Sequence, residues 1–560
     1  MSAFRPKLLD CLPGYGKAQF GKDLSAGITV GVLALPLAMA FSIASGMSPT
    51  AGIWTAIVAG FLIAAFGGSR VQIGGPTGAF IPIIYGIVAG YGVQNLLVAT
   101  MLAGVLLLAM GLARLGQLIR FIPISVVIGF TNGIAVVIFM SQLKDFFGLQ
   151  IAEVPADFFA KIKVLSAHAH TLHWPTFAFA AVSLLFLFSW NRAVVHRWPL
   201  LRLIPGPLAV LVGGTLAQTL FAFPVETIGS RFGGIPQGLP AIALPALSLE
   251  SLRYLIAPAI TIALLGAIES LLSARVADGS IDDKHDPNQE LVAQGIANIA
   301  APLFGGFAAT GAIARTATNV RTGGRTPVAG MIHSLVLLAV VLVAAPLARD
   351  IPLPTLSAIL MMVAINMGEW HAFRELFRYS LNYRTILLAT FLITVVFDLT
   401  LAVEIGMVLA SLFFIYRVSN LTRIERLPLD ELQFLPAFQN PDGTMRVAAY
   451  KMFGSLFFGT VHKIEALGEP GHNHPEVLVL DMQQVINMDT TGLEAMEALH
   501  KTLARQGATL LLCNLNAQPG SLILRSGFRE VIGEDNLCGD LYGALARAKQ
   551  LLPPAEVADV

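Results

Sequence analysis

The most constraining feature of this chain is a succession of long apolar segments between residues 24 and 417. A helix needs ~20 apolar residues to cross a bilayer, and we count about fourteen segments near that length. Hydrophobic residues make up 55% of the chain and charged residues only 13%. Soluble domains carry about 25% charged residues, so the sequence predicts an α-helical polytopic membrane protein. The segments are 24–44, 50–66, 77–90, 94–113, 121–142, 175–190, 202–222, 252–274, 288–302, 311–320, 328–347, 354–367, 383–398 and 402–417.

The character of the chain changes after residue 420. Short strands are predicted at 446–452, 455–458, 477–481 and 509–513, with a helix at 490–504. Strands and helices that alternate in this way indicate a small α/β domain. The predicted division is a cytoplasmic N-terminal segment (1–22), a transmembrane domain (23–420), a linker (421–440) and the α/β domain (441–553).

Glycine-rich stretches interrupt two apolar regions, at 67–80 (GGSRVQIGGPTGAF) and at 305–316 (GGFAATGAIART). We expect a helix to begin in each, the second at about Gly311, with Arg315 on its second turn. Paired interruptions in the two halves of a membrane chain indicate a transporter's substrate site. Both lie at the third segment of their half (1–225 and 250–420), which predicts an inverted repeat with about seven segments in each half. Helix starts inside a membrane offer unpaired amides and partial positive charge, which suits an anion.

One acidic residue, Glu269, lies in the middle of the eighth apolar segment. An ionised carboxylate there is costly unless it is paired or protonated, so we expect it to face the protein interior. A carboxyl group that takes up a proton when an anion binds would couple H⁺ to transport. The structural alternative is a carboxylate bonded to the amides of the interrupted helices or to Arg315. Arg315 either sets an attractive field for the substrate or neutralises Glu269, and we favour a field role over direct coordination.

Other classes of function find no support in the sequence. The phosphate-binding pattern G-x-x-x-x-G-K-[ST] is absent, which argues against ATP-driven pumping. The three cysteines are widely spaced, the histidines are scattered and the net charge is +1. We therefore predict no metal, no cofactor and no nucleic-acid partner, and nothing indicates an enzyme. The N-terminal residues lack a signal-peptide core, and the distribution of Lys and Arg among the loops predicts that both termini are cytoplasmic.

Together these residues resemble the sulfate permease (SulP) family of anion transporters over nearly the whole chain. The resemblance rests on Pro36 in the first segment, the element 75–77 (GPT), Glu269 with Ser270, Arg315 and the element 322–324 (TGG). In the tail, 489–492 (DTTG) resembles the D-[ST]-[ST]-G element of the STAS domain that usually follows in that family. Around Pro36 and Glu269 the chain is most similar to bacterial members related to C4-dicarboxylate transporters.

The resemblance implies a 7+7 inverted repeat, with spans 1–4 and 8–11 as a core domain and spans 5–7 and 12–14 as a gate domain. It also implies a homodimer in which the core slides against the gate, as in elevator carriers. The anion would lie between the starts of spans 3 and 10. The substrate-binding residues implied by position are Phe41, Thr77, Gly78, Ala79, Phe80, Gly311, Ala312, Ile313, Ala314 and Arg315.

Two departures from the family pattern affect the predicted function. Leu37 stands where many members have glutamine, and Glu269 stands where sodium-dependent bicarbonate carriers tend to have aspartate. The second departure favours H⁺ over Na⁺ as the coupling ion. We therefore predict an H⁺-coupled importer of a C4-dicarboxylate or sulfate in a bacterial cytoplasmic membrane, with Glu269 setting the coupling. The alternatives are Na⁺-coupled bicarbonate uptake, an uncoupled anion channel, and a membrane-anchored sensor that signals through the tail.

In the tail, Asp489 or Thr490 is expected to cap the helix that begins there. The regulatory alternative treats Asp489, Thr490, Thr491 and Gly492 as a phosphorylation element, because a hydroxyl group at a helix start is accessible to a kinase. The domain could also bind a cytoplasmic protein partner. The capping role remains our first interpretation.

Overall fold

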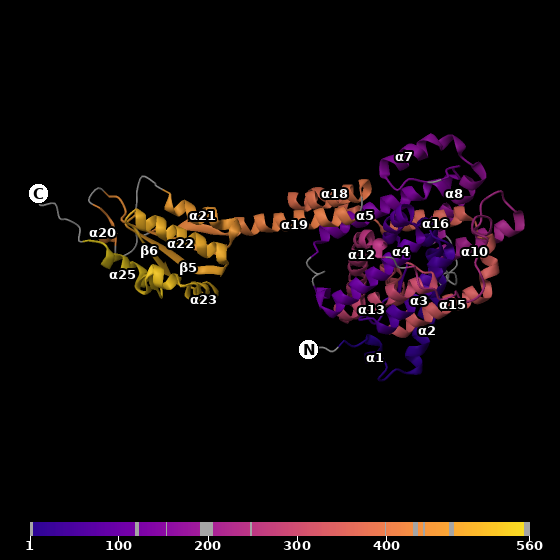
Figure 1. The fold of residues 1–560 in the computed structure, drawn as a ribbon, viewed down its shortest axis with the longest axis horizontal. Coiled ribbons are helices and arrows are strands. Elements are labelled where there is room, and N and C mark those ends of the chain that lie inside the picture. Colours follow the sequence, from indigo (N-terminus) through magenta and orange to yellow (C-terminus); the bar gives the residue numbers. More distant parts are fainter. Residues whose placement is uncertain are drawn as a thin grey trace, which may run out of the picture. The chain divides into compact units, whose positions relative to one another are not determined.

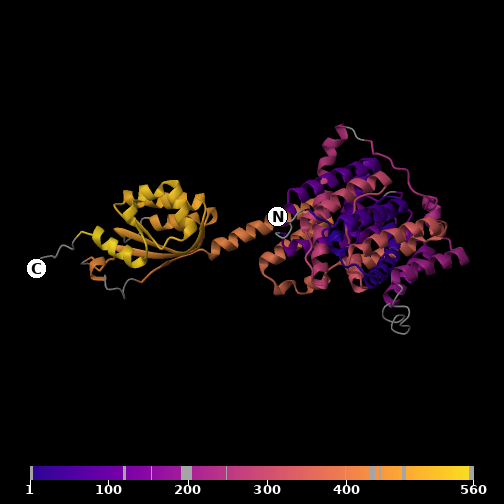
Figure 2. The same cartoon turned by 90° about the horizontal axis from the view of Figure 1, so that it is seen from below.

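The computed structural model describes residues 4–117, 122–152, 154–190, 205–246, 249–397, 399–428, 435–440, 443–469 and 475–553. The chain divides into two compact units, Met1–Met407 and Val408–Val560 (Figure 1, Figure 2). The first unit is helical, and the second combines a sheet with helices.

Each apolar segment expected from the sequence lies in a helix, and the last of these helices, Leu399–Leu421, runs across the division between the units. Within the described ranges, seven helices are long and apolar enough to cross a membrane, and four shorter apolar helices accompany them. The predicted α-helical polytopic fold is therefore confirmed. In chain order the helices of these segments are α2 (Lys17–Ala44), α3 (Pro49–Phe66), η1 (Gly78–Phe80) with α4 (Ile81–Leu112), α5 (Ile124–Ser141), α8 (Trp174–Ser189), α10 (Gly206–Phe221), α12 (Leu249–Ile281), α13 (Pro287–Ala300), α14 (Ile313–Arg321), α15 (Pro327–Ala344), α16 (Leu353–Met367), α18 (Leu381–Val396) and α19 (Leu399–Leu421).

Short helices and turns connect the long ones. They are α1 (Lys7–Cys11), α6 (Leu143–Phe147), α7 (Phe158–Ala167), η3 (Ala169–Thr171), α11 (Ile228–Phe232), η6 (Ala301–Phe304), η7 (Ala345–Asp350), α17 (Trp370–Arg374) and η8 (Leu376–Arg378).

Local sequence determines where several of these helices begin and end. Ser48, Asp286 and Thr326 accept hydrogen bonds from backbone amides at the starts of α3, α13 and α15, and each of them precedes a proline. Proline is favoured at the first helical position because it has no amide hydrogen to leave unpaired. The third and fourth segments run on as α4, but Gly92, with φ of 81°, breaks the helix between them, as the sequence predicts.

The helices of the first unit pack as two groups. In one group α2, α3, α4, α12, α13 and α15 contact one another, and in the other α5 contacts α16 and α18, and α16 contacts α8. Small residues bring α2 close to α15: a Cβ atom added at Gly27 would lie 2.7 Å from the Ala329 carbonyl oxygen. Gly31 makes a similar approach one turn later, and such a pair of small residues is typical of helices packed in lipid. The first group holds both interrupted stretches and so positions the candidate site.

The second unit contains a five-stranded sheet of order β3-β4-β5-β6-β7. β3 (Arg423–Arg426) pairs antiparallel with β4 (Val447–Leu456), and β5 (Val477–Met488), β6 (Thr509–Cys513) and β7 (Leu537–Cys538) continue the sheet in parallel. β3 lies within 421–440, the segment expected to be a linker. The accompanying helices are α20 (Leu435–Phe438), η9 (Phe458–Thr460), α21 (Val461–Glu465), η10 (Ala466–Gly468), α22 (Thr490–Arg505), α23 (Ala517–Ser526), α24 (Phe528–Ile532), η11 (Glu534–Asn536) and α25 (Leu541–Leu551).

The expectation of two separate strands at 446–452 and 455–458 is wrong. They form the single strand β4, whose pairing with β5 shifts register on both sides of Gly454. Gly454 has φ of 99°, which permits a bulge without ending the strand, and β4 ends at Leu456 before η9 begins.

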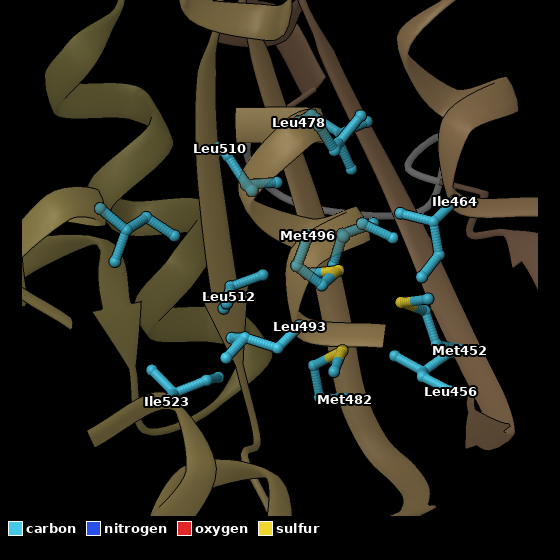
Figure 3. Packing of buried hydrophobic residues seen from close by; sticks show 14 of the residues in the cluster. Met452, Leu456, Ile464, Leu478, Met482, Leu493, Met496, Leu510, Leu512 and Ile523 are labelled. Atoms are coloured by element: carbon cyan, nitrogen blue, oxygen red, sulfur yellow. The ribbon is translucent and has the colours of Figure 1, made fainter. Parts of the chain in front are cut away.

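Apolar side chains cover both faces of this sheet. On one face Leu478, Leu480 and Met482 of β5 pack with Leu493 and Met496 of α22 (Figure 3). On the other face the alternate residues Val477 and Val479 pack with Leu545 of α25. This alternation of neighbours along β5 is what a strand covered on both faces requires. The small α/β domain predicted for the tail is therefore confirmed.

Candidate functional site

The two interrupted stretches meet in the structure, although more than two hundred residues separate them in the sequence. β1 (Gly74–Gly75) and β2 (Thr310–Gly311) pair antiparallel, with Gly74 opposite Gly311 and Gly75 opposite Thr310. The Ala312 amide extends this pairing by donating to the Ile73 carbonyl oxygen over 2.8 Å. Each strand then leads directly into a helix start, η1 after β1 and α14 after β2.

The second helix begins later than the sequence indicated. We expected a start at about Gly311, but Gly311 belongs to β2 and α14 begins at Ile313. The reason is the pairing with β1, which holds 310–311 extended. Arg315 is therefore the third residue of α14 and lies in its first turn, not its second.

Both helix starts lack a capping side chain. Neither N-cap residue, Thr77 for η1 or Ala312 for α14, contributes a side-chain hydrogen bond to its own helix. The first amides of a helix have no acceptor within the helix, and they carry its partial positive charge. The two starts therefore present hydrogen-bond donors of the kind that bind an anion.

Arg315 lies next to the paired strands β1 and β2, which are called the crossing below. Its side chain is 2% exposed, and its Nη2 donates to the Pro76 carbonyl oxygen. A Cβ atom added at Gly75 would lie 2.7 Å from Arg315 Nη1, so glycine is needed there for the guanidinium group to fit. Among the described residues, no acceptor binds Nη1 and no carboxylate forms a direct ion pair with Arg315. Arg315 and Glu269 therefore do not touch, although the charge of each acts on the other.

Glu269 on α12 contacts the first helix start. Its Oε2 accepts a hydrogen bond from Thr77 Oγ1 over 2.7 Å. The backbone around Glu269 is also held from both stretches, because Thr310 Oγ1 donates to the Gly266 carbonyl oxygen and Gln72 Nε2 donates to the Ser270 carbonyl oxygen, each over 2.9 Å. Glu269 is thereby fixed next to the crossing, bonded to a side-chain hydroxyl and not to the helix-start amides.

These groups line one cavity of about 410 Å³. Nine of the ten residues expected to bind substrate border it, together with Glu269. The exception is Phe80, which is fully buried and packs near Gly266 of α12. The bordering residues among those expected are Phe41, Thr77, Gly78, Ala79, Gly311, Ala312, Ile313, Ala314 and Arg315.

The other walls of the cavity come from α2, α5, α12 and α16. Leu37 borders the cavity. Many members of the family that the chain resembles have glutamine at this position. Thr131 of α5, Asn366 of α16 and Glu369, just after α16, bring further polar groups that the sequence did not single out. The available signal was weak, since these are single polar residues within or at the end of apolar segments. The remaining lining residues are Val127, Phe130, Ile134, Leu272, Val363 and Met367.

This arrangement suits a small anion held between two helix starts. The donors are backbone amides, the hydroxyl group of Thr131 and the amide of Asn366, with the buried cation of Arg315 close by. The walls come from both helix groups, so a movement of one group against the other would change the shape of the cavity. In the described part of the chain, no group of three or more His, Cys, Asp or Glu side chains is arranged to hold a metal ion.

In the second unit, the residues 489–492 lie at the start of α22. Asp489 caps this helix, since its Oδ1 accepts a hydrogen bond from the Gly492 amide over 2.8 Å. Thr490 is exposed, Thr491 is half-buried, and Gly492 packs against the Leu456 carbonyl group. The geometry gives Asp489 a structural role of the expected kind and leaves the hydroxyl group of Thr490 accessible.

Comparison with known proteins assigns the chain to a family. The model of the sulfate permease family matches residues 20–390, and that of the STAS domain matches residues 439–546. YvdB of Bacillus subtilis (strain 168), whose name marks it as a candidate sulfate transporter, is 42% identical over 93% of this chain and 97% of its own length. The bicarbonate transporter BicA of a Synechocystis species is 31% identical over 96% of each chain.

A solved structure has the same fold. Murine solute carrier 26 family member A9, described as an anion transporter in the inward-facing state, superimposes with a TM-score of 0.84 over 97% of this chain and 94% of its own. The sequences are 20% identical, so this likeness concerns the fold alone. From the family match, its extent and the helix order, the chain belongs to the sulfate permease family of multi-pass membrane anion transporters and carries a C-terminal STAS domain.

Proposed function

We propose that this chain is a secondary-active transporter that imports a C4-dicarboxylate or sulfate together with H⁺. The proposal rests on one cavity. The starts of η1 and α14 border it, together with the buried side chain of Arg315 and the acidic side chain of Glu269. Helix starts favour anions by up to ~2 kcal/mol in a partly buried site. A volume of about 410 Å³ also accommodates a four-carbon dianion as well as sulfate.

In this proposal Glu269 carries the coupling proton. An approaching dianion and an ionised Glu269 would repel each other across the same cavity, so binding favours the protonated carboxyl group. The hydrogen bond from Thr77 fixes Glu269 at the start of η1, on the wall of the proposed anion site. Release of anion and proton on the other side of the membrane then completes one transport cycle.

The proposed movement is of the elevator type. The helix group that holds β1 and β2 would slide against α5 and α16, which complete the cavity wall. We further propose that the protein works as a homodimer in a bacterial cytoplasmic membrane, with both termini in the cytoplasm, and that 489–492 in the STAS domain is a site of regulation. The accessible Thr490 supports the last point.

A second candidate is Na⁺-coupled bicarbonate uptake. It is favoured by the likeness to BicA, a bicarbonate transporter, over nearly the whole length of both chains. The identity with that protein is 31%, against 42% with YvdB, and Glu269 replaces the aspartate expected of sodium-dependent carriers.

Uptake into proteoliposomes distinguishes these functions. Labelled succinate, fumarate, sulfate and bicarbonate are offered to the full-length protein under an inward H⁺ gradient, an inward Na⁺ gradient or neither. We expect accumulation of succinate or sulfate that requires the H⁺ gradient. Bicarbonate accumulation under the Na⁺ gradient would establish the second candidate instead. Uncoupled conductance would indicate a channel. If none of the four anions moved, the result would favour the alternative of a membrane-anchored sensor.

A further inference from the structure

A second cavity lies at the other end of α5, outside the site described above. It has a volume of about 650 Å³ and is bordered by the ends of α2 and α18 and by the short helices α6, α7 and α11. α5 borders the first cavity from Val127 to Ile134 and the second from Ile134 to Ser141. Ile134 belongs to both linings, so a single side chain on α5 marks the place where the two cavities adjoin.

Five charged residues border this second cavity, and four of them have partners. Arg231 of α11 pairs with Asp145 of α6 over 2.8 Å and also with Glu226. Asp157 caps α7 by accepting from the Ala160 amide over 2.7 Å. Lys144 of α6 donates to the Ala152 carbonyl oxygen over 3.4 Å. The fifth residue, Lys161 of α7, has no hydrogen bond or ion pair within the described ranges.

Lys161 is also the most buried of these cations. Its side chain is 6% exposed although α7 lies in a connection between membrane-spanning helices and not within one. Burial lowers the pKa of the Lys161 ammonium group, and the nearby carboxylate of Asp157 opposes that shift. Although the residue is buried as a whole, its ammonium group is accessible from the cavity and has no hydrogen-bond acceptor among the described residues. An anion in the cavity would supply that acceptor.

We propose that this cavity is an anion-binding vestibule, in which Lys161 forms an ion pair with an oxygen atom of a small carboxylate or oxyanion. Arg231 is already neutralised by two carboxylates and Lys144 is bonded to a carbonyl oxygen, so Lys161 is the cation of this wall whose ammonium group can take up an anion. Apolar side chains make up much of the remaining wall, among them Ile43, Ile81, Ile134, Met140 and Val396. These walls suit the carbon chain of an organic dicarboxylate.

The vestibule extends the proposed function by giving the same class of substrate a second site beside the first. Its relevance to transport rests on that proposed function, but binding at Lys161 does not depend on transport. The two ideas can therefore fail separately.

The test measures binding of labelled succinate and labelled sulfate to the full-length protein in lipid nanodiscs at equilibrium. The wild-type protein should bind two anions per chain. Lys161→Met should retain one site, with affinity at the other reduced about tenfold or more, the loss expected for a charged hydrogen bond. Lys163→Met, a substitution of an exposed lysine two residues away on the same helix, should leave both sites intact. Comparing the two labels shows whether the vestibule prefers the organic anion.

Thermal unfolding gives a second readout. Without added anion, Lys161→Met should unfold at the same or a higher temperature than wild type, because a partly desolvated ammonium group is replaced by an apolar side chain of similar length. Stabilisation by added succinate should be smaller in Lys161→Met than in Lys163→Met, since a ligand that binds the native state raises the unfolding temperature. Identical site numbers and affinities in wild type and Lys161→Met would overturn the inference, whatever the uptake assays show. A lower unfolding temperature without anion would also overturn it, since Lys161 would then be a structural residue.

Discussion

The stretches 67–80 and 305–316 both pass from a two-residue strand into a helix, yet their side chains bind different partners. Polar side chains of the second stretch and of the α14 turns after it bind the backbone of the first. Arg315 bonds to Pro76, Thr316 accepts from the Ile73 amide over 3.0 Å, and Asn319 donates to the Val71 carbonyl oxygen over 2.9 Å. The first stretch instead directs Thr77 to the acid on α12.

This difference separates two tasks that one site must perform. The second stretch holds the crossing together and supplies the buried positive charge, so it should govern whether an anion binds at all. The first stretch contacts Glu269, so it should govern how anion binding depends on the proton. Neither task is visible from the backbone, which is alike in both stretches.

The largest effect is expected at Arg315. Arg315→Ala should reduce uptake about 100-fold or more under every gradient, because losing the charged contact to Pro76 and the buried positive field costs about 3 kcal/mol. The measurement is initial uptake of labelled succinate and sulfate into proteoliposomes. Arg321→Ala, at the exposed far end of the same helix, is the control and should transport within about twofold of wild type. Uptake by Arg315→Ala near the wild-type rate would contradict the claim that the second stretch governs anion binding.

A smaller and more selective effect is expected at Thr77. Thr77→Val loses the hydroxyl group that donates to Glu269, so uptake driven by an H⁺ gradient should fall about tenfold, the equivalent of one hydrogen bond to a charged group. Thr77→Ser keeps the donor and should restore most of the rate. The comparison between the stretches fails if Thr77→Val reduces uptake equally with and without the H⁺ gradient, because the first stretch would then affect binding alone.

The smallest effect is expected on stability, from a substitution that disturbs the packing beside β1 and β2. A Cβ atom at Gly311 would collide with the Gln72 side chain, which donates to Ser270 on α12. Gly311→Ala should therefore destabilise the protein by about 1–3 kcal/mol, as overpacking of a filled site does. Gly86→Ala is the control, since nothing lies within 4 Å of an added Cβ atom there, and its stability should change by less than about 1 kcal/mol. Equal unfolding temperatures for the two variants would show that Gln72 moves aside freely.

Most of the architecture could be predicted from the sequence, because each long apolar segment needs no distant partner to become a helix in lipid. Glu269 and Arg315 could be singled out for a different reason. A charged side chain in an apolar segment is energetically costly, which indicates a functional role. The strands β1 and β2 could not be predicted: two residues carry no periodicity, and each depends on a partner far away in the sequence. That missing pairing is why α14 was expected to start at Gly311.

The walls of the site were harder to predict than its centre. Asn366 and Glu369 lie at and just beyond the end of an apolar segment, where polar residues usually mark the membrane surface. Phe80 was expected in the cavity because it follows Thr77 to Ala79, but it lies in the 3₁₀ turn η1, where successive side chains turn by about 120°, and its ring is buried in the core. In the tail, 446–452 and 455–458 were expected to be separate strands, whereas the positive φ of Gly454 between them allows a bulge within one strand.

The central claim is that Glu269 couples the proton to the anion, and one measurement tests it most directly. Wild type and Glu269→Gln are reconstituted in proteoliposomes, and uptake of labelled succinate and sulfate is compared with and without an inward H⁺ gradient. Our account predicts that the gradient accelerates uptake by the wild-type protein only, while Glu269→Gln retains exchange of internal for external anion that is insensitive to the gradient. Acid-driven uptake that survives unchanged in Glu269→Gln would contradict it.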